Sequence, residues 1–287
     1  MEYKKLKLGI IGHGFVGKAT DYGFNKDVEK FIVDPVYSTT VDDLAEFSPD
    51  IIFICVPTPM SADGSQDCSI VLESVKKIKE NGMQSIVVLK STILPSYLEE
   101  IEKFDENIIY NPEFLREKHA KEDFINSRLI VFGGKKSVSE KVSKFYQKHS
   151  RCLHKDHIFV ELKTASFIKY TINTFLASKV LLFNEYFQLF NSLNSNDSWE
   201  DVIKVIAIDE RIGSSHMGVP GHDGRFGFGG ACFPKDTAAL AAYSDGSEVD
   251  MKVLKEIIKK NNKIRSQYKS LDKREQEQNV SFSLNED

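Results

Sequence analysis

The chain contains 287 residues, of which 41% are hydrophobic and 28% are charged, and its formal net charge is −4. This composition is ordinary for a globular protein and excludes global disorder. A mildly acidic chain is a poor candidate for nucleic-acid binding, which needs a basic surface, so we expect no nucleic-acid partner. The length indicates about two domains.

No apolar run approaches the roughly 18 residues that a membrane-spanning helix needs, so we expect no membrane association. The first residues lead directly into a strand pattern, without the apolar core of a signal peptide. The four cysteines, Cys55, Cys68, Cys152 and Cys232, form no CxxC pair, which argues against a disulfide framework. We therefore expect a cytoplasmic protein.

The first half of the chain alternates between short apolar runs and helical patterns. The apolar runs that predict strands are 6–11, 30–34, 51–56, 85–89, 107–110 and 129–132. The patterns that predict helices are 15–25, 69–81 and 137–149. This alternation predicts an α/β fold with a Rossmann-type, doubly wound and mainly parallel sheet.

The pattern changes after residue 160. Apolar residues recur at helical spacing over 161–193 and predict a helix of about 30 residues, which is long for a globular domain. Further helices are predicted at 199–208, with Asp197 or Ser198 as the N-cap, and at 237–243 and 249–268. Between them, 209–234 is a long glycine-rich loop, and such loops are usually functional.

These patterns divide the chain into three parts. Residues 1–160 form the α/β domain, 161–270 form an all-α domain, and 271–287 form a polar tail that we expect to be frayed.

The first strand is followed by Gly12–Gly17 (GHGFVG), a GxGxxG pattern that opens a helix. In this context the pattern is typical of dinucleotide binding. Gly12 allows the tight turn, Gly14 lets the backbone approach a pyrophosphate, and Gly17 lets helix and strand pack closely. The helix N-terminus favours an anion. The alternative is a glycine turn that binds nothing.

Asp34 ends the second strand, where a carboxylate accepts hydrogen bonds from ribose hydroxyls and repels a 2′-phosphate. This position favours NAD over NADP; the alternative is a turn with Pro35. The ends of later strands lie at the same edge of the sheet. We therefore expect NAD to bind Gly12, Gly14, Phe15, Val16, Gly17, Asp34, Val56, Pro57, Thr58 and Thr92.

Asn111–Glu117 (NPEFLRE) follows a strand directly, and its carboxylates Glu113 and Glu117 are expected to point into one crevice. The alternative is a helix that starts at Pro112. Lys169 and Asn173 are four residues apart on the long helix and could stabilise an oxyanion together. By spacing alone, a solvated polar stripe is the better interpretation of that pair.

Cys232 follows a run of glycines and precedes a predicted helix, a position where the helix dipole makes a thiol nucleophilic. The alternative is a small buried cysteine in a turn. A rival hypothesis places zinc on His149, Cys152, His154 and His157. Their place in a charged connection favours a surface loop, so we expect no metal.

Taken together, these motifs resemble the UDP-glucose 6-dehydrogenase / UDP-N-acetyl-mannosamine dehydrogenase family. The matching segments follow the family's order: GHGFVG, VPTP, KST, NPEFLRE, the Lys169-x-x-x-Asn173 helix, DERIG and GFGGACFPKD. NPEFLRE and GFGGACFPKD are highly specific, and the resemblance covers about Leu6 to Tyr243. It implies a helical second domain like that of 6-phosphogluconate dehydrogenase, used to form a homodimer.

The resemblance implies oxidation of the primary alcohol of a UDP-sugar to a carboxylate, with two NAD and no metal. Cys232 matches the nucleophile that traps the aldehyde as a thiohemiacetal and then carries a thioester. Glu113 matches the group that assists thioester hydrolysis, and Lys169 and Asn173 match the pair that stabilises oxyanions.

Further positions match residues with supporting roles. Asp236 and Thr92 match residues that position the catalytic water and the lysine, and Glu117 matches a position near the nicotinamide. Arg211 matches an arginine that, in the family, reaches the pocket from the dimer partner. The residues implied in binding the sugar nucleotide are Phe114, Leu115, Arg116, Lys169, Asn173, Arg211, Arg225, Phe228 and Gly229.

Two departures from the family pattern bear on the substrate. The loop 220–230 is longer than the family's PGxGFGG, so we expect Arg225 to reach the diphosphate in its own way. Family members also carry a third α/β domain over the UDP, whereas no βαβ pattern follows Tyr268. The alternatives are therefore a dehydrogenase of a smaller hydroxy compound, or an NAD-binding subunit that a partner completes.

Overall fold

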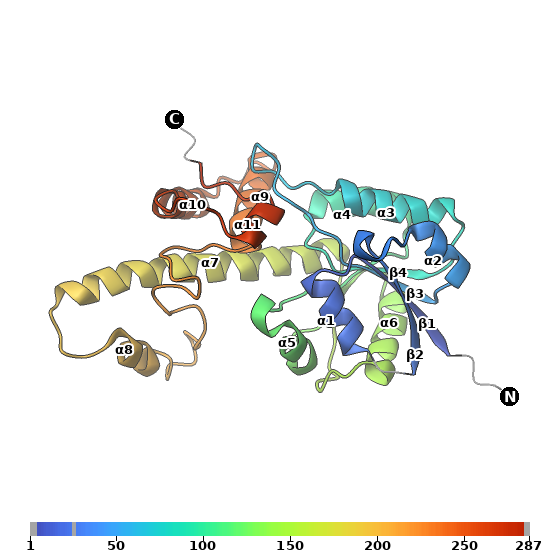
Figure 1. Ribbon diagram of the computed structural model, residues 1–287, viewed down its shortest axis with the longest axis horizontal. Coiled ribbons are helices and arrows are strands. Elements are labelled where there is room, and N and C mark those ends of the chain that lie inside the picture. Colours follow the sequence, from blue (N-terminus) through green and yellow to red (C-terminus); the bar gives the residue numbers. More distant parts are fainter. Residues whose placement is uncertain (1–4, 25–26, 284–287) are drawn as a thin grey trace. The chain divides into compact units, whose positions relative to one another are not determined.

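The computed structural model describes residues 5–24 and 27–283 and divides into two compact units (Figure 1). The first unit comprises the chain up to Thr58 together with Asp67–Lys169. The second comprises Pro59–Gln66 and the chain from Tyr170 onward. Each unit is described by itself below.

In the described part of the chain, the first unit contains a seven-stranded sheet of order β2-β1-β3-β4-β5-β6-β7. Its strands are β1 (Leu6–Ile11), β2 (Val28–Val33), β3 (Ile51–Ile54), β4 (Ile86–Leu89), β5 (Ile109–Tyr110), β6 (Val131–Gly133) and β7 (Ile158–Val160). Neighbouring strands run parallel except β5 and β6, which are antiparallel. The expected mainly parallel, doubly wound sheet is confirmed.

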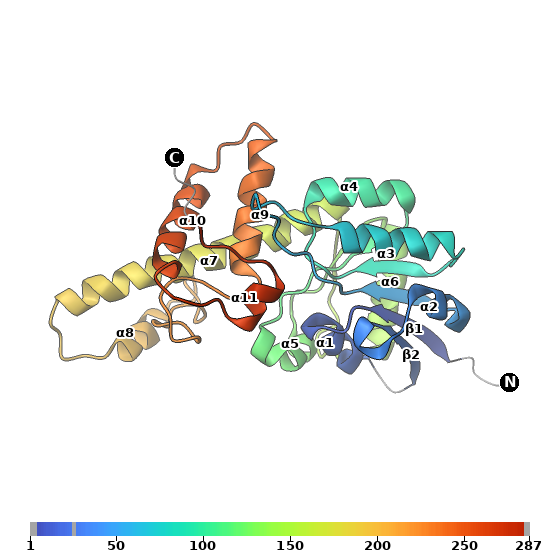
Figure 2. The same ribbon diagram turned by 45° about the horizontal axis from the view of Figure 1, so that its top comes forward.

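Apolar side chains cover both faces of this sheet. Successive residues of β3 alternate, so that Ile52 and Ile54 enter one core and Phe53 enters the other. A strand buried on both faces must be apolar throughout, which is why IIFICV reads as a continuous run. Figures 1 and 2 show α2 (Val41–Phe47), α3 (Ser69–Glu80) and α4 (Pro95–Phe104) on one face, and α1 (Phe15–Gly23), α5 (Ala120–Asn126) and α6 (Lys136–His149) on the other.

Sequence patterns missed the shorter elements of this unit: α2, α4, α5, β7 and the 3₁₀ turns η1 (Pro35–Tyr37) and η2 (Glu117–His119). Helices of seven to ten residues hold too few turns for a period to stand out. A signal was available for α2, since Thr40 and Asp43 form a capping box at its start. The first helix, expected over 15–25, ends at Gly23, and Asn25 lies outside the described residues.

The second unit is helical. Its elements are most of α7 (Leu162–Ser192), α8 (Trp199–Ile206), α9 (Phe233–Asp245), α10 (Lys252–Arg265) and α11 (Lys273–Glu277). The predicted long helix is confirmed, and Ser198 caps α8 by accepting a hydrogen bond from the Asp201 amide. Trp199 packs against Phe183 and Met217 and fixes α8 to α7. The expected long loop between α8 and α9 is also present, without helix or strand.

The expectation of a frayed polar tail after residue 270 is wrong for the residues that the structure describes. Asp272 forms a capping box that starts α11, and Glu275, Val280 and Phe282 are buried. The prediction failed because it treated each charge as solvated, whereas Glu275 pairs with a buried arginine from α10. Among the described residues, no helix is long and apolar enough to span a bilayer.

Candidate active site

The loop that follows β1, together with the start of α1 (residues 12–17), has the shape that a dinucleotide requires. Gly12 adopts a φ of 87°, and a Cβ there would lie 2.9 Å from the backbone of Cys55 and Val56. A Cβ on Gly17 would lie 2.1 Å from the Gly12 carbonyl oxygen, so helix α1 can pack here only without a side chain. Gly14 faces open space, with nothing within 4 Å of its Cβ position. The loop is therefore closed on its inner side and open where a pyrophosphate would approach.

Asp34 lies against this loop. One carboxylate oxygen accepts a hydrogen bond from the His13 amide (2.6 Å), and the other accepts one from the Val36 amide (3.0 Å) and so caps η1. Asp34 therefore forms the turn with Pro35 and also lies at the position expected for a ribose-binding carboxylate, so the two interpretations of this residue are compatible. The His13 side chain is largely buried, with Nδ1 2.9 Å from the Tyr37 hydroxyl.

The ends of β3 and β4 meet as their topology predicts. The Thr58 hydroxyl donates to the Thr92 carbonyl (3.0 Å), and the Ser91 hydroxyl donates to the Val56 carbonyl (2.6 Å). Val56, Thr58 and Thr92 are buried, and Pro57 is exposed. These bonds fix two loops at the carboxyl edge of the sheet, where ligands of such folds bind.

A buried ion pair joins the loop after β5 to the third turn of α7. Lys169 Nζ donates to the Glu113 carbonyl (2.5 Å) and lies 3.3 Å from Glu113 Oε1. Glu113 Oε2 accepts from the Leu115 amide (2.6 Å), and the Lys169 ammonium lies over the Phe114 ring. Glu113 is 6% exposed and Lys169 is 2% exposed. No helix starts at Pro112, and the solvated stripe suggested by spacing is wrong.

The last two residues of the NPEFLRE motif, Arg116 and Glu117, lie apart from this pair. Glu117 begins η2 and is exposed, so the two carboxylates occupy different environments. Arg116 is also exposed, and its guanidinium and backbone amide both donate to Asp123. Leu115 is half-buried.

In the second unit, Asp236 is held from two sides. Asn173 Nδ2 donates to Asp236 Oδ2 (2.6 Å), and Lys235 Nζ donates to Asp236 Oδ1 (2.5 Å). Asn173, Lys235 and Asp236 are all buried. The sequence pattern predicted no role for Lys235, although this residue lies within the GFGGACFPKD segment. Because Lys235 is buried and donates to the candidate catalytic residue Asp236, it belongs to the candidate active site.

Cys232 immediately precedes α9, with Pro234 in the helix's first turn and Asp236 N donating to the Cys232 carbonyl (2.9 Å). It is half-buried, whereas the other three cysteines are buried. Burial raises the pKa of the Cys55 thiol to about 11, and burial also raises the pKa of Cys152. Cys232 is therefore the cysteine best placed to react, at a helix N-terminus that favours a thiolate.

The expected substrate residues of the second unit occupy different surroundings. Phe228 is buried and Gly229 is half-buried in the loop before Cys232. Arg225 Nη1 donates to the Ser270 carbonyl (2.8 Å). Arg211 is highly exposed and pairs with Asp209.

The four residues of the zinc hypothesis do not converge. His149 lies 3.2 Å from Asp27, Cys152 Sγ donates to the Phe124 carbonyl, and His157 bonds to Ser143. Across residues 5–24 and 27–283, no three His, Cys, Asp or Glu side chains group as metal ligands.

Two models of one protein family match this chain. The NAD binding domain of the UDP-glucose/GDP-mannose dehydrogenase family matches residues 36–150, and its central domain matches residues 163–263. UDP-glucose 6-dehydrogenase of Rickettsia felis is 34% identical over 221 residues, which cover 74% of this chain and 47% of that protein. UDP-glucose 6-dehydrogenase TuaD of Bacillus subtilis is 29% identical over 90% of this chain and 63% of its own length. The chain spans about half the length of the Rickettsia relatives that it matches.

Solved structures agree with this similarity. A UDP-glucose dehydrogenase from Pyrobaculum islandicum superposes with a TM-score of 0.75 at 25% identity, covering 91% of this chain and 69% of that one. A 3-hydroxyisobutyrate dehydrogenase from Mycobacterium tuberculosis superposes with a TM-score of 0.66 over 96% of both chains. At 15% identity this second likeness shows the fold alone.

The clamp between Arg116 and Asp123 yields a pH-dependent prediction. Partial burial opposes ionisation of Asp123, but hydrogen bonds from Arg116 outweigh it and hold the pKa of that carboxyl below its usual value. Its stabilising effect is therefore complete above the usual pKa of about 4 and is lost as the pH falls through the lowered value. Asp123→Asn should lower the melting temperature clearly at pH 7 and much less at pH 3.

The matched control is Glu122→Gln, since Glu122 is the exposed neighbour on the same helix. It should change the melting temperature little at either pH. An Asp123→Asn defect of equal size at both pH values would contradict the account.

Proposed function

Because this chain belongs to the UDP-glucose/GDP-mannose dehydrogenase family, we propose that it oxidises the C6 alcohol of UDP-glucose, or of a related UDP-hexose, to the uronate. The reaction would proceed in two NAD-dependent steps. The observation that carries the proposal is Cys232: it is the one cysteine that is not buried, and it stands at a helix N-terminus four residues before the buried Asp236. We place the reaction in the cytoplasm, where reduced thiols persist.

The loop after β1 would hold the cofactor. A cradle that is blocked to side chains at Gly12 and Gly17 but open at Gly14 fits a pyrophosphate, and Asp34 beside it fits an adenosine ribose without a 2′-phosphate. NAD, when bound, supplies a hydride acceptor for each oxidation step. The ends of β3 and β4, with Val56, Thr58 and Thr92, would line the rest of the dinucleotide site.

Cys232 would hold the intermediate between the two oxidations. Its thiolate adds to the aldehyde and forms a thiohemiacetal, which becomes a thioester when the second hydride leaves. A covalent intermediate cannot escape half-oxidised. Lys169 and Asn173 would stabilise the oxyanions, and the Lys169 ammonium lies 3.3 Å from Glu113 Oε1. Glu113 would direct the water that releases the uronate and restores the thiol.

The first test uses two substitutions in the proposed machinery. Cys232→Ala should abolish formation of the uronate from UDP-glucose, and the second NADH with it, because no group remains to trap the aldehyde for its second oxidation. Glu113→Gln should accumulate the enzyme thioester, because hydrolysis loses its base; intact-protein mass spectrometry would detect the added uronyl mass. Full activity of Cys232→Ala would refute the mechanism, and Cys152→Ala serves as a cysteine control.

The second test concerns the cofactor. Gly14→Ala adds a methyl group in open space, so the fold should tolerate it with little change in melting temperature. The same methyl group would meet the pyrophosphate, so we expect the Kd for NAD to rise about tenfold or more in calorimetry. Gly246→Ala, whose nearest neighbour atom would be 3.7 Å away, is the matched control. Unchanged NAD affinity in Gly14→Ala would argue against a dinucleotide on this loop.

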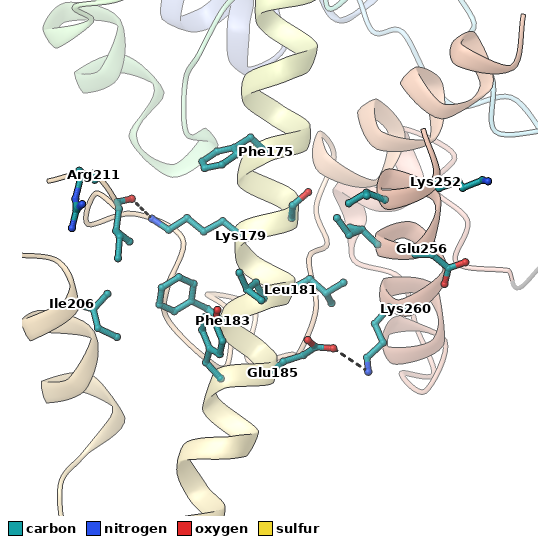
Figure 3. A pocket seen from close by; sticks show the side chains of 16 residues that line it. Phe175, Lys179, Leu181, Phe183, Glu185, Ile206, Arg211, Lys252, Glu256 and Lys260 are labelled. Carbon is teal, nitrogen blue, oxygen red and sulfur yellow. Dashed lines mark hydrogen bonds and ion pairs between the residues drawn. The ribbon is translucent and has the colours of Figure 1, made fainter. Parts of the chain in front are cut away.

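We also propose that the chain forms a homodimer through its helical unit. Phe175, Leu182 and Tyr186 of α7 are 64%, 44% and 47% exposed. Figure 3 shows the cavity that they border, about 940 Å³ in volume, between α7, the α8 end and α10. A group of exposed apolar side chains around one cavity fits an interface with a second copy of the chain. Arg211 lines the same cavity, which fits the family role of an arginine that acts from the dimer partner.

Leu182→Glu should convert the homodimer to monomer, because it places a charge in the apolar contact. Light scattering after size exclusion measures the mass. Val249→Glu, an exposed apolar position outside the cavity lining, should leave the dimer intact. A native chain that is monomeric at tens of micromolar, or a dimeric Leu182→Glu variant, would contradict the proposal.

A further inference from the structure

A buried cluster ties the end of the chain to the loop that precedes Cys232. We name Asp223–Gly230 the glycine loop and Arg265–Phe282 the C-terminal segment. Arg265 lies at the end of α10, and its Nη1 donates to Asp223 Oδ2 while its Nη2 donates to Glu275 Oε1, both at 2.7 Å. Glu275 Oε1 also accepts from the Gly230 amide at 3.0 Å. One guanidinium therefore joins both segments.

The Arg265–Glu275 pair at the centre of this cluster is sealed from solvent, whereas Asp223 lies at its edge. The Arg265 side chain is 1% exposed and Glu275 is 0% exposed. The guanidinium lies over the rings of Tyr268 and Phe282, at 5.6 and 5.3 Å. Buried charges are costly unless each one is paired, so the loss of one partner leaves the others as uncompensated buried charges. The cluster therefore acts as one unit, and the C-terminal segment cannot move without releasing the glycine loop.

The loop backbone itself rests on the ion pair. A Cβ on Gly229 would lie 2.2 Å from Arg265 Nη2 and 2.5 Å from Glu275 Oε1, so any side chain there would displace the ion pair. Next to it, the Asn261 side chain accepts from the Phe228 amide (2.7 Å) and donates to the Phe228 carbonyl (3.0 Å). Side chains from α10 and α11 thus satisfy backbone hydrogen-bonding groups of the loop, as a neighbouring strand does in a sheet.

The residues by which this loop exceeds the PGxGFGG pattern make contacts with the same segment. Asp223 bonds to Arg265, as described above. Arg225 donates to the Ser270 carbonyl and lies over the Tyr268 ring at 5.1 Å. The Phe226 amide donates to the Tyr268 hydroxyl at 2.9 Å. The longer loop and the C-terminal segment are therefore complementary, and the whole of that segment lies beyond residue 263, the last residue that the family model matches.

We propose that Arg265 and Glu275 are positioning residues: they fix the glycine loop and, through Gly230, the placement of Cys232 two residues later. The identification of a sugar nucleotide as the substrate rests on the proposed function. The placement of the Cys232 thiol does not depend on it. Arg225 then holds the loop against the C-terminal segment through its contacts with Ser270 and Tyr268, in addition to any contact with a diphosphate.

The test compares Glu275→Gln and Asp223→Asn with Glu277→Gln, a control on the exposed face of α11. The first measurement is the alkylation rate of Cys232 by iodoacetamide, followed by peptide mass spectrometry, since the other cysteines are buried. We expect the rate to change about threefold or more in the two cluster variants, because lost charged hydrogen bonds free the loop. Glu277→Gln should match the native rate.

The second measurement separates positioning from general damage. In the cluster variants KM for UDP-glucose should rise about tenfold, with a smaller effect on kcat and an unchanged Kd for NAD. If Glu275→Gln does not fold, Asp223→Asn, whose side chain is partly exposed, carries the test. Native Cys232 reactivity in folded cluster variants would overturn the proposal. If the native chain does not turn over UDP-glucose, the alkylation rates still decide the positioning role.

Discussion

The buried pair of Lys169 and Glu113 is the interaction on which the candidate site depends. Lys169 belongs to α7 and Glu113 to the loop after β5, so their contact sets the rotation of the long helix about its own axis within the first unit. Asn173 follows four residues later on the same helix and belongs to the second unit. Asn173 in turn holds Asp236 of α9. A single unbroken helix therefore carries both contacts.

The charges of the site are paired in a way that leaves little freedom. Glu113 faces Lys169, and Asp236 lies between Asn173 and Lys235. Every one of these side chains is buried, and burial without a partner would be costly for each. The same principle operates at the loop before Cys232, where Arg265 serves two carboxylates. Buried ion pairs thus fix the position of catalytic candidates in both units, and they use polar side chains outside the motifs, such as Arg265 and Glu275, as well as those within them.

Long elements and glycine-dependent turns could be predicted from the sequence. The buried strands, α7 and the Gly12–Gly17 turn follow from local patterns, because each depends on residues that are close in sequence. Burial of Lys169 and Asn173 could not be predicted, since spacing shows which residues share a face but not what covers that face. The order of the tail was missed for the same reason: the partner of Glu275 lies ten residues away on another helix.

A fold of this kind does not by itself determine the reaction, because function resides in the site. The central claim is that Cys232 retains the substrate through two oxidations, which distinguishes this chain from a dehydrogenase that oxidises a hydroxyl group once and from a cofactor-binding subunit. The most direct measurement is the stoichiometry of NADH formed per UDP-glucose consumed by the purified chain, read by absorbance and by quantification of the uronate. The account predicts two NADH per sugar nucleotide, with no free aldehyde; one NADH per substrate, or none, would contradict it.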